Sequence, residues 1–288
     1  GSELQRLHRL RTLFRTGRRR GGLTPVDGIP ALASYHEWLA VERQLKAGCA
    51  LADRMGLRAG QRVLELGCGT GLLAEHLVER VGSQGEVLGL DAMALRVQIA
   101  HQRGRYNLRF QVGDPCSLQR FGAGSFDAIV ANGVLHTWPD AAAALTECAR
   151  LLAPAGCLGV ATQSAAHPHP AERLQRELMA EPPYADHPPP AESRRYPVGA
   201  DELDRLLRGA GLVSVQVEAR PETFLHATGE GALEHMQASA WGHFLMHLPP
   251  DLRDRARAEI LRRLEALRGP DGIRHDAMQI VAIAFKSP

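Results

Sequence analysis

The stretch VLELGCGTG, Val63–Gly71, places a short apolar run directly before three glycines at alternating positions. The apolar run is typical of a buried strand, and a helical pattern follows it over Leu72–Val81 and stops at Gly82. A strand, a glycine turn and a helix start together present backbone N–H groups to a ligand. This unit therefore predicts a ligand site at the carboxyl end of a strand.

The same alternation of a strand and a helix is predicted through the middle of the chain. The patterns predict strands at Arg62–Leu66, Glu86–Leu90, Leu108–Val112, Phe126–Ala131 and Cys157–Thr162, and helices at Leu72–Val81, Ala94–Arg103 and Ala141–Leu152, the last capped by Asp140. The strands are short and nearly all apolar, as strands covered on both faces should be. Repeated units of this length predict an α/β fold with a doubly wound, mostly parallel sheet.

The regular alternation of strands and helices ends after Thr162. Eight of the 18 prolines fall between Pro168 and Pro197, which predicts a Pro-rich lid loop over 166–200. We then expect a helix at Asp201–Arg208, a strand at Leu212–Val217, two helical pieces in 229–268 broken at Pro249-Pro250, and a last strand at Met278–Phe285. The prediction is a single domain over 29–288, with an N-terminal helical cap at 29–60, a ligand-binding core at 61–165, and the remaining sheet with a helical insert at 201–288.

Composition and charge narrow the classes of function. Residues 1–28 form a basic leader with seven arginines and no acid between Arg6 and Arg20. We interpret it as a solvated, flexible segment, and an arm for nucleic acid or a membrane surface is the alternative. Five cysteines without a CxxC pair argue against a disulfide framework and fit a cytoplasmic protein. No run of 18 apolar residues occurs, so no membrane partner is expected.

The glycine turn departs from the phosphate-binding patterns. Gly67, Gly69 and Gly71 form G-x-G-x-G, and Leu72 stands where a dinucleotide fingerprint needs its third glycine. Glu65, two residues before the first glycine, would repel a pyrophosphate and attract a cation. The pattern therefore favours a ligand that is neutral or positively charged.

Two further acids follow the next strands of the predicted sheet. Asp91 ends the strand in VLGLDAM, and Asp114 lies in FQVGDP. Because the carboxyl ends of parallel strands meet at one edge, we expect both to lie on the same rim as Glu65. A carboxylate at Asp91 can accept hydrogen bonds from ribose hydroxyls. A turn aspartate that satisfies its own loop is the alternative at each position.

Taken together, ELGCGTG, GLDAM, GDP, SFDAIVANGVLHTWPD and the ARLLAPAG–CLGVAT segment resemble the class I S-adenosylmethionine-dependent methyltransferase family. The resemblance covers about Leu57–Thr162 and, more loosely, Pro197–Phe285. It implies a Rossmann-like, seven-stranded sheet with an antiparallel last strand, and S-adenosyl-L-methionine as the cofactor. One departure is the turn Pro154-Ala155-Gly156, where the family often has Pro-Gly-Gly.

The resemblance also implies where the cofactor binds. The glycine turn would hold the methionine part, Asp91 the ribose and Asp114 the adenine amino group, and the loop after the fourth strand would touch the cofactor. The implied cofactor residues are Glu65, Gly67, Cys68, Gly69, Gly71, Asp91, Ala92, Met93, Gly113, Asp114, Pro115, Asn132, Gly133 and Val134.

Methyl transfer from a sulfonium is an in-line displacement, so the enzyme has to place the acceptor and exclude water. His136, in GVLHTWPD, is the candidate general base, because a neutral imidazole can take a proton at neutral pH. A packing or hydrogen-bonding role in the loop is the alternative, and His226 is a weaker second candidate base.

Aromatic residues outside the predicted core are candidates for contact with the cofactor or the acceptor. Tyr35 and Trp38 begin an N-terminal helix that either folds over the cofactor or packs against the core, and Trp241 belongs to a stretch that lines an acceptor pocket or packs a lid. His243 and His247 have the i, i+4 spacing of metal ligands without an evident third ligand, so no metal is predicted.

The favoured function is methyl transfer to a small organic molecule, with the hydroxyl oxygen of a metabolite or biosynthetic intermediate preferred. One alternative is a C- or N-methyltransferase domain of a biosynthetic assembly line, with an acceptor bound to a carrier protein. A nucleic-acid methyltransferase is the other. It is not favoured, because NGVLHTW differs from the Asn/Asp-Pro-Pro-aromatic motif of enzymes that act on flipped bases.

Overall fold

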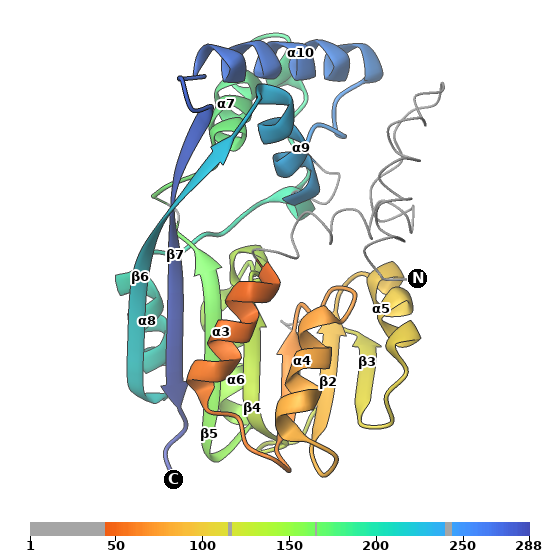
Figure 1. Ribbon diagram of the computed structural model, residues 1–288, viewed down its shortest axis with the longest axis vertical. Helices are drawn as coiled ribbons and strands as arrows, with labels where there is room; N and C mark the ends of the chain where they lie inside the picture. Colours follow the sequence, from red (N-terminus) through yellow and green to blue (C-terminus); the bar gives the residue numbers. More distant parts are fainter. Residues whose placement is uncertain (1–43, 115–116, 165, 240–243) are drawn as a thin grey trace. The chain divides into compact units, whose positions relative to one another are not determined.

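The computed structural model describes residues 44–114, 117–164, 166–239 and 244–288 (Figure 1). These residues form two compact units. The sheet unit comprises the described residues of 43–167, 195–222 and 277–288, and the insert unit comprises those of 168–194 and 223–276. Two compact units can belong to one folding domain, so the single domain over 29–288 stays a prediction. The leader at 1–28 and the first part of the helical cap lie outside the described residues.

Seven strands form one sheet in the order β3-β2-β1-β4-β5-β7-β6. The pairs among the first five strands are parallel, and β7 runs antiparallel to β5. This is the predicted Rossmann-like fold class with an antiparallel last strand. The strands are β1 (Arg62–Leu66), β2 (Glu86–Asp91), β3 (Leu108–Val112), β4 (Phe126–Asn132), β5 (Leu152–Gln163), β6 (Val213–His226) and β7 (Ile273–Phe285).

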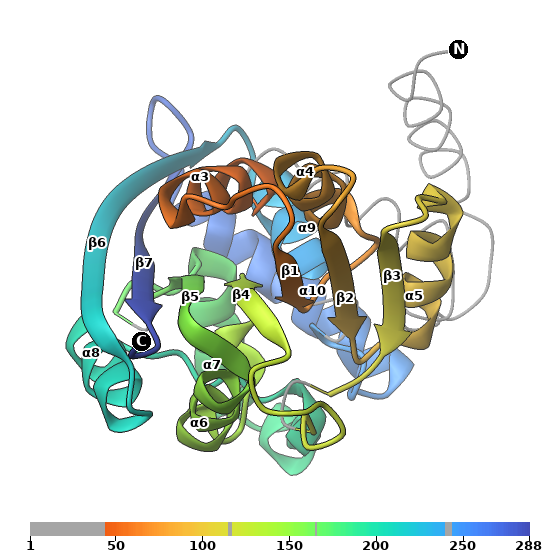
Figure 2. The same cartoon turned by 90° about the horizontal axis from the view of Figure 1, so that it is seen from below.

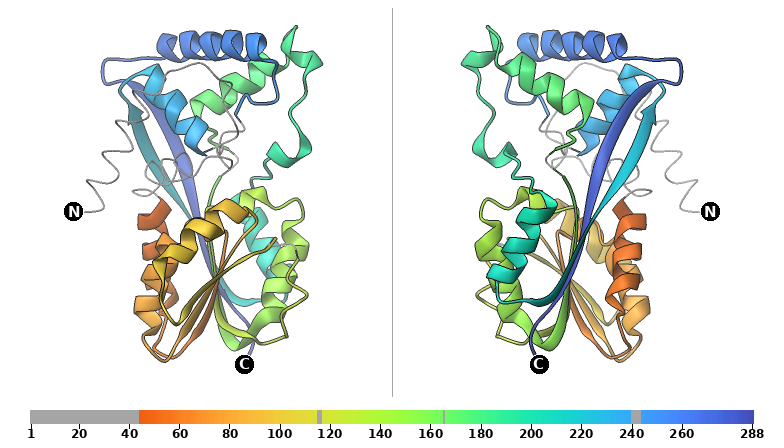
Figure 3. Two further views of the ribbon diagram at one scale, coloured as in Figure 1. Left: turned by 90° about the vertical axis from the view of Figure 1, so that its right-hand side faces the viewer. Right: turned by 90° about the vertical axis from the view of Figure 1, so that its left-hand side faces the viewer.

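Helices cover both faces of the sheet, which explains why its central strands are nearly all apolar. On one face lie α3 (Lys46–Met55), α4 (Leu72–Val81) and α5 (Ala94–Ala100), and on the other lie α6 (Ala141–Leu151) and α8 (Ala200–Gly209) (Figures 2 and 3). Each face has its own buried cluster. Leu51, Leu77 and Val97 belong to the first, and Leu145 and Leu203 to the second.

The sheet order places a topological switch point between β1 and β4. From β1 the chain adds β2 and then β3 on one side, and it continues from β4 to β5 on the other. In open α/β sheets, ligands bind in the crevice at the carboxyl ends of the strands beside such a point. The glycine turn after β1 and the loop after β4 both lie there.

The insert unit is helical and has a hydrophobic core of its own. Its helices are α7 (Pro170–Met179), α9 (Gly229–Ser239) and α10 (Pro250–Ala266). Their buried side chains include Leu174, Leu233 and Ile260. The second predicted helical piece begins at Pro250, which confirms a break at Pro249-Pro250, whereas the first piece is shorter than expected because residues 244–249 are not helical.

The region 166–200 is not the continuous lid loop that its prolines predict. It contains α7, and Pro170 stands in the first turn of that helix, where a missing backbone N–H removes no helical hydrogen bond. The imidazole Nδ1 of His169 caps the helix by accepting from the N–H of Ala171 (3.1 Å). The number of prolines in this region predicted a loop, and this was wrong because proline disfavours the interior of a helix but is tolerated in its first turn.

Several boundaries differ from the prediction. β5 runs through the predicted turn at 153–156, with a register irregularity against β4 and Ala155 at φ 60°. β6 and β7 extend to 14 and 13 residues, well beyond the expected strands. The helix expected at Ala94–Arg103 ends as the 3₁₀ turn η3 (His101–Arg103) before Gly104.

Other elements match the prediction. The bounds of β1, β3 and α4 are those expected from the sequence, and Asp140 caps α6 by accepting from the N–H of Ala143 (2.9 Å).

Candidate active site

The glycine turn leaves β1 and crosses the end of its neighbour β2. The N–H groups of Gly67 and Cys68 both donate to the carbonyl of Leu90, at 2.8 and 2.9 Å. Gly71 is the N-cap of α4. The turn is therefore tied to the sheet, and the first N–H groups of α4 face the carboxyl edge, as the sequence predicts.

Two of the glycines have no room for a side chain. Gly67 has φ 72°, and a Cβ there would lie 2.7 Å from Val134 Cγ2, in the loop after β4. Gly71 has φ 88°, and a Cβ there would lie 2.5 Å from the ring of Phe110 on β3. Only glycine adopts this backbone region without strain and also allows such close approach.

Asp91 lies at the end of β2, with only 5% of its surface exposed. Its Oδ2 accepts from the N–H of Gly69 (2.9 Å) and its Oδ1 accepts from the N–H of Met93 (2.9 Å). A carboxylate offers about four acceptor positions, so each oxygen keeps one for a ligand. The side chain thus connects the glycine turn to the start of α5 and retains the capacity to bind two hydroxyls.

The other two acids of the predicted rim differ in burial. Glu65, on β1, is 3% exposed, and Asp114, after β3, is exposed. The N–H of Gly113 donates to the carbonyl of Asp91 (3.0 Å), which places the loop after β3 beside the end of β2. Two buried carboxylates on adjacent strands suit a ligand that carries positive charge.

The loop after β4 completes this edge of the sheet. The side-chain amide of Asn132 donates to the carbonyl of Gln44 (2.8 Å), and the N–H of Gly133 donates to the carbonyl of Ala161 on β5 (2.7 Å). Val134 is buried against the glycine turn. These bonds hold the loop between β1 and β5, next to the start of α3.

His136 lies in the 3₁₀ turn η4 (Leu135–Thr137), just after this loop. Its ring Nδ1 is buried, with no hydrogen-bond partner among the described residues. Burial, with a smaller contribution from the positive charge of Arg195, lowers the pKa of His136 from 6.5 to about 3. The imidazole is therefore neutral at physiological pH.

Arg195 is the residue near this site that sequence reasoning missed. The N–H of Tyr196 donates to the carbonyl of His136 (2.7 Å), so the chain segment that carries Arg195 runs along η4. The paired arginines in ESRRYP were the available signal. They stand in the Pro-rich stretch, and nothing in the local pattern connects them to His136.

The remaining predicted residues divide into three groups. Cys68 is buried in the glycine turn, whereas Met93 follows β2 as the N-cap of α5, and Ala92 is exposed between Asp91 and Met93. His226 belongs to the insert unit, in a group of histidines described below. The four residues outside the described part of the chain are Tyr35, Trp38, Pro115 and Trp241.

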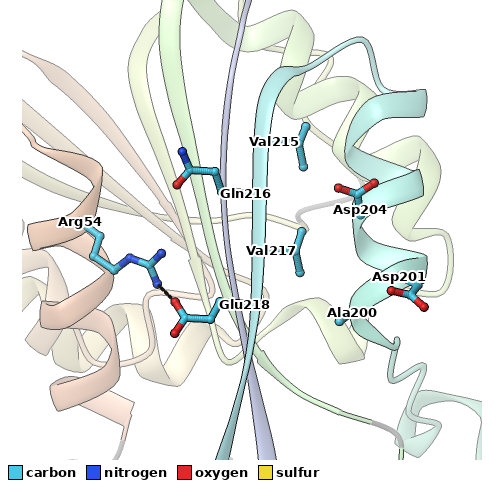
Figure 4. A pocket seen from close by; sticks show the side chains of 8 residues that line it. All are labelled: Arg54, Ala200, Asp201, Asp204, Val215, Gln216, Val217 and Glu218. Atoms are coloured by element: carbon cyan, nitrogen blue, oxygen red, sulfur yellow. Dashed lines mark hydrogen bonds and ion pairs between the residues drawn. The ribbon is translucent and has the colours of Figure 1, made fainter.

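A surface hollow of about 530 Å³ lies elsewhere in the sheet unit, beside β6 (Figure 4). Arg54 of α3 forms an ion pair with Glu218 of β6 on one side of the strand (2.9 Å), and Asp201 and Asp204 of α8 lie on the other. None of its lining residues belongs to the predicted cofactor or catalytic set. The hollow is therefore not the candidate active site.

Two general expectations can be compared with the described residues. Among the described residues, Cys49 and Cys157 are free thiols. Among the described residues, no helix is both long enough and apolar enough to span a membrane.

Known proteins share both the motifs and the fold of this chain. A family model described as "Methyltransferase domain" matches residues 63–156. The trans-aconitate 2-methyltransferase of Methylobacterium nodulans is 34% identical over 237 residues, covering 81% of this chain and 87% of that protein. The nocamycin O-methyltransferase of Saccharothrix syringae is 30% identical over 250 residues, covering 82% and 89%. The crystal structure of the YcgJ protein of Bacillus subtilis has a TM-score of 0.61 at 21% identity, covering 84% and 99%.

A glycine turn and a buried acid at the switch point of this sheet define a nucleoside-binding enzyme of the Rossmann-like class. The chain belongs to the class I S-adenosylmethionine-dependent methyltransferases, and S-adenosyl-L-methionine is its cofactor. It is a methyltransferase, and the two relatives named above are methyltransferases of small molecules.

Proposed function

We propose that this chain methylates an oxygen of a small organic acceptor, and that this oxygen is already an anion, as in a carboxylate, when it enters the site. The observation that carries the proposal is geometric: the segment with Arg195 runs along η4, where the N–H of Tyr196 donates to the carbonyl of His136 (2.7 Å), and the ring Nδ1 of the half-buried His136 is shielded from water. The positive charge of Arg195 helps to keep this imidazole neutral.

The predicted cofactor residues fit S-adenosyl-L-methionine. Asp91 keeps an acceptor position on each carboxylate oxygen, which suits the two ribose hydroxyls. The buried acids Glu65 and Asp91 suit a ligand with a positive charge and without phosphates. When bound, the cofactor supplies an electrophilic methyl group. The residues of this chain then have to hold the acceptor in line and keep water out.

His136 is poorly suited to remove a proton from an alcohol. A general base works best when its pKa lies near the working pH, and a pKa of about 3 makes this imidazole a weak proton acceptor. A carboxylate needs no base, because its ordinary pKa of about 4 leaves it ionised at neutral pH. We therefore assign His136 a neutral hydrogen-bonding role toward the acceptor.

Arg195 supplies the charge that an anionic acceptor needs. A guanidinium binds a carboxylate with two parallel hydrogen bonds, which fixes orientation as well as affinity. Trans-aconitate, which the relative from Methylobacterium methylates, is a carboxylate anion, and the relative from Saccharothrix is an O-methyltransferase. Both names are consistent with an oxygen acceptor.

The role of the helical insert in selecting the acceptor remains a prediction. Met236 and Phe244, which belong to the same stretch as Trp241, are buried in the hydrophobic core of the insert unit. For these two residues the packing role is supported.

The experiment compares acceptors that differ only in the oxygen group. The full chain is incubated with S-adenosylmethionine carrying a deuterated methyl group, and with trans-aconitate, its amide and the matching alcohol in separate reactions. Mass spectrometry should find the labelled methyl on the carboxylate as an ester. Transfer to the neutral alcohol or to nitrogen, with the carboxylate ignored, would contradict the proposal.

Two variants and a matched control test the roles of Arg195 and His136 separately. Arg195→Gln should raise the KM for the carboxylate by about tenfold or more, the effect expected from losing a charge-assisted hydrogen bond, and leave cofactor affinity unchanged. Arg194→Gln, at the exposed neighbouring position, is the matched control and should behave like the wild type. His136→Gln should lower kcat/KM by about tenfold and not by the 10²–10⁴-fold that a general base contributes.

A further inference from the structure

Four histidines meet in the insert unit, and each comes from a different element. His169 caps α7, His226 ends β6, His235 lies in α9 and His275 lies near the start of β7. The ring of His169 lies 5.0 Å from that of His226, 5.5 Å from that of His235 and 4.9 Å from that of His275, between ring centres. The ring centres of His226 and His235 are 5.4 Å apart.

We propose that His169, His226 and His275 bind a divalent transition-metal ion of the zinc class, with His235 stacked beside them. This inference is independent of the proposed acceptor, because it concerns residues of the insert unit alone.

The distances between the ring nitrogens already suit a metal ion. One ligand atom from each of the three residues lies within 4.8 Å of the others. Tetrahedral zinc with Zn–N bonds of about 2.0–2.1 Å holds its nitrogen ligands about 3.3 Å apart. The Nε2 atoms of His169 and His226 are 3.2 Å apart, so this pair needs almost no movement. His275 needs a shift of about 1.5 Å at most on the same geometry.

The type and burial of the ligands favour a particular class of metal. His169 and His275 are each 8% exposed, so a bound ion would be largely shielded from water. Three imidazoles suit zinc, cobalt, nickel or copper, whereas calcium and magnesium require oxygen ligands. The site therefore predicts strong discrimination against magnesium and calcium.

Metal binding has a defined consequence for His169. With Nδ1 accepting from the N–H of Ala171, the ring proton lies on Nε2 and points at the Nε2 of His226. Coordination through Nε2 moves this proton to Nδ1, so the ring remains neutral and the cap bond to Ala171 is lost. The amide signal of Ala171 is therefore a direct reporter of the bound metal.

The ligands would join parts of the chain that are far apart in sequence. His169 and His226 alone are separated by 57 positions. A metal that binds only the folded arrangement stabilises it, because the unfolded chain has no preformed site. We therefore expect the ion to act as a cross-link that holds α7, β6 and β7 together.

The test uses the full chain without an affinity tag, stripped of metal with a chelator. After addition of Co²⁺ and gel filtration, we expect one retained ion per chain, visible absorption typical of tetrahedral cobalt, and a higher melting temperature. The amide of Ala171 should shift in the NMR spectrum. Magnesium should produce none of these effects.

Variants separate this site from other histidines. His226→Asn and His275→Asn should each weaken Co²⁺ binding by more than about tenfold, since loss of even an outer partner of a metal ligand costs about 10–100-fold. The double variant His243→Asn/His247→Asn removes the pair at helical ligand spacing and should bind as the wild type does. Binding of S-adenosylmethionine, measured in parallel, checks that each variant is folded.

Two outcomes would overturn the proposal. One is a wild-type chain that retains no cobalt after gel filtration, which would make the cluster a hydrogen-bonded group of packed rings. The other is cobalt retention that survives in His226→Asn and disappears in the His243/His247 double variant.

Discussion

The carboxylate of Asp91 accepts a hydrogen bond of 2.9 Å from the backbone N–H of Gly69, 22 positions earlier in the chain. The bond joins the end of β2 to the glycine turn that follows β1. A second bond from Met93 fixes the other oxygen. One buried side chain thus fixes two segments of the candidate cofactor site and still has the capacity to bind a ligand.

Removing the charge of Asp91 should weaken cofactor binding. A hydrogen bond to a charged group contributes about 1.5–3 kcal/mol, so Asp91→Asn is expected to lower the affinity for S-adenosylmethionine by about 10- to 100-fold. Calorimetry with the cofactor and with S-adenosylhomocysteine measures this. Asp114→Asn, at the exposed position after β3, is the comparison and should cost less. Equal losses in both variants would argue against a special role for Asp91.

An added methyl group at Gly67 should destabilise the fold as well as the site. Gly67→Ala combines a positive φ, which costs about 1–2 kcal/mol, with overpacking against Val134, which costs about 1–3 kcal/mol. Gly60→Ala is the control, because Gly60 has φ 85° with no atom within 4 Å of an added Cβ. It should show the backbone cost alone. In urea unfolding, Gly67→Ala and Val134→Ala together should cost less than the sum of the two single changes.

The burial of His136 should make stability depend on pH. Its pKa is about 3 in the folded chain and about 6.5 when unfolded, so the unfolded chain binds the extra proton between these values. Stability is therefore complete above about pH 6.5 and is lost as the pH falls toward about 3. His136→Gln should lose less stability than the wild type between about pH 7.5 and about pH 5 in urea unfolding. An equal loss in both proteins would show that other groups carry the pH dependence.

Cys157 should be inert in the folded protein. Burial raises the pKa of its thiol to about 12, and the thiolate is the reactive form. Iodoacetamide at about pH 8 should leave Cys157 unlabelled until urea unfolds the chain. Peptide mass spectrometry follows each site, and the half-buried Cys49 should react first among the described cysteines. Rapid labelling of Cys157 without denaturant would mean that β5 opens locally.

Local patterns predicted the sheet unit well, because its strands and helices are short, regular and doubly covered. The bounds of β1, β3 and α4 follow from apolar runs and glycine stops that lie within the segments themselves. The extra length of β6 and β7 was not visible in the same way. In β6 the half-buried positions include Arg220, Glu222 and His226, whereas Leu225 is exposed, so residue polarity does not mark where the strand continues.

The sequence predicted those residues of the candidate site that lie at the end of a strand recognisable from its local pattern. Glu65, Asp91 and Asp114 were identified because the topology of a parallel sheet brings strand ends to one edge. Arg195 was not, because its position beside His136 depends on how a Pro-rich segment returns to the sheet. The helix α7 was missed for a different, local reason, because proline is tolerated in the first turn of a helix.

The sequence by itself determined that this chain builds a doubly wound sheet with a glycine turn suited to a cationic nucleoside, because those features depend on short-range patterns of apolar residues, glycines and acids. Only the tertiary structure decided the environment of His136 and brought four histidines from distant segments together. Burial and proximity are properties of the folded chain, and no local pattern records them.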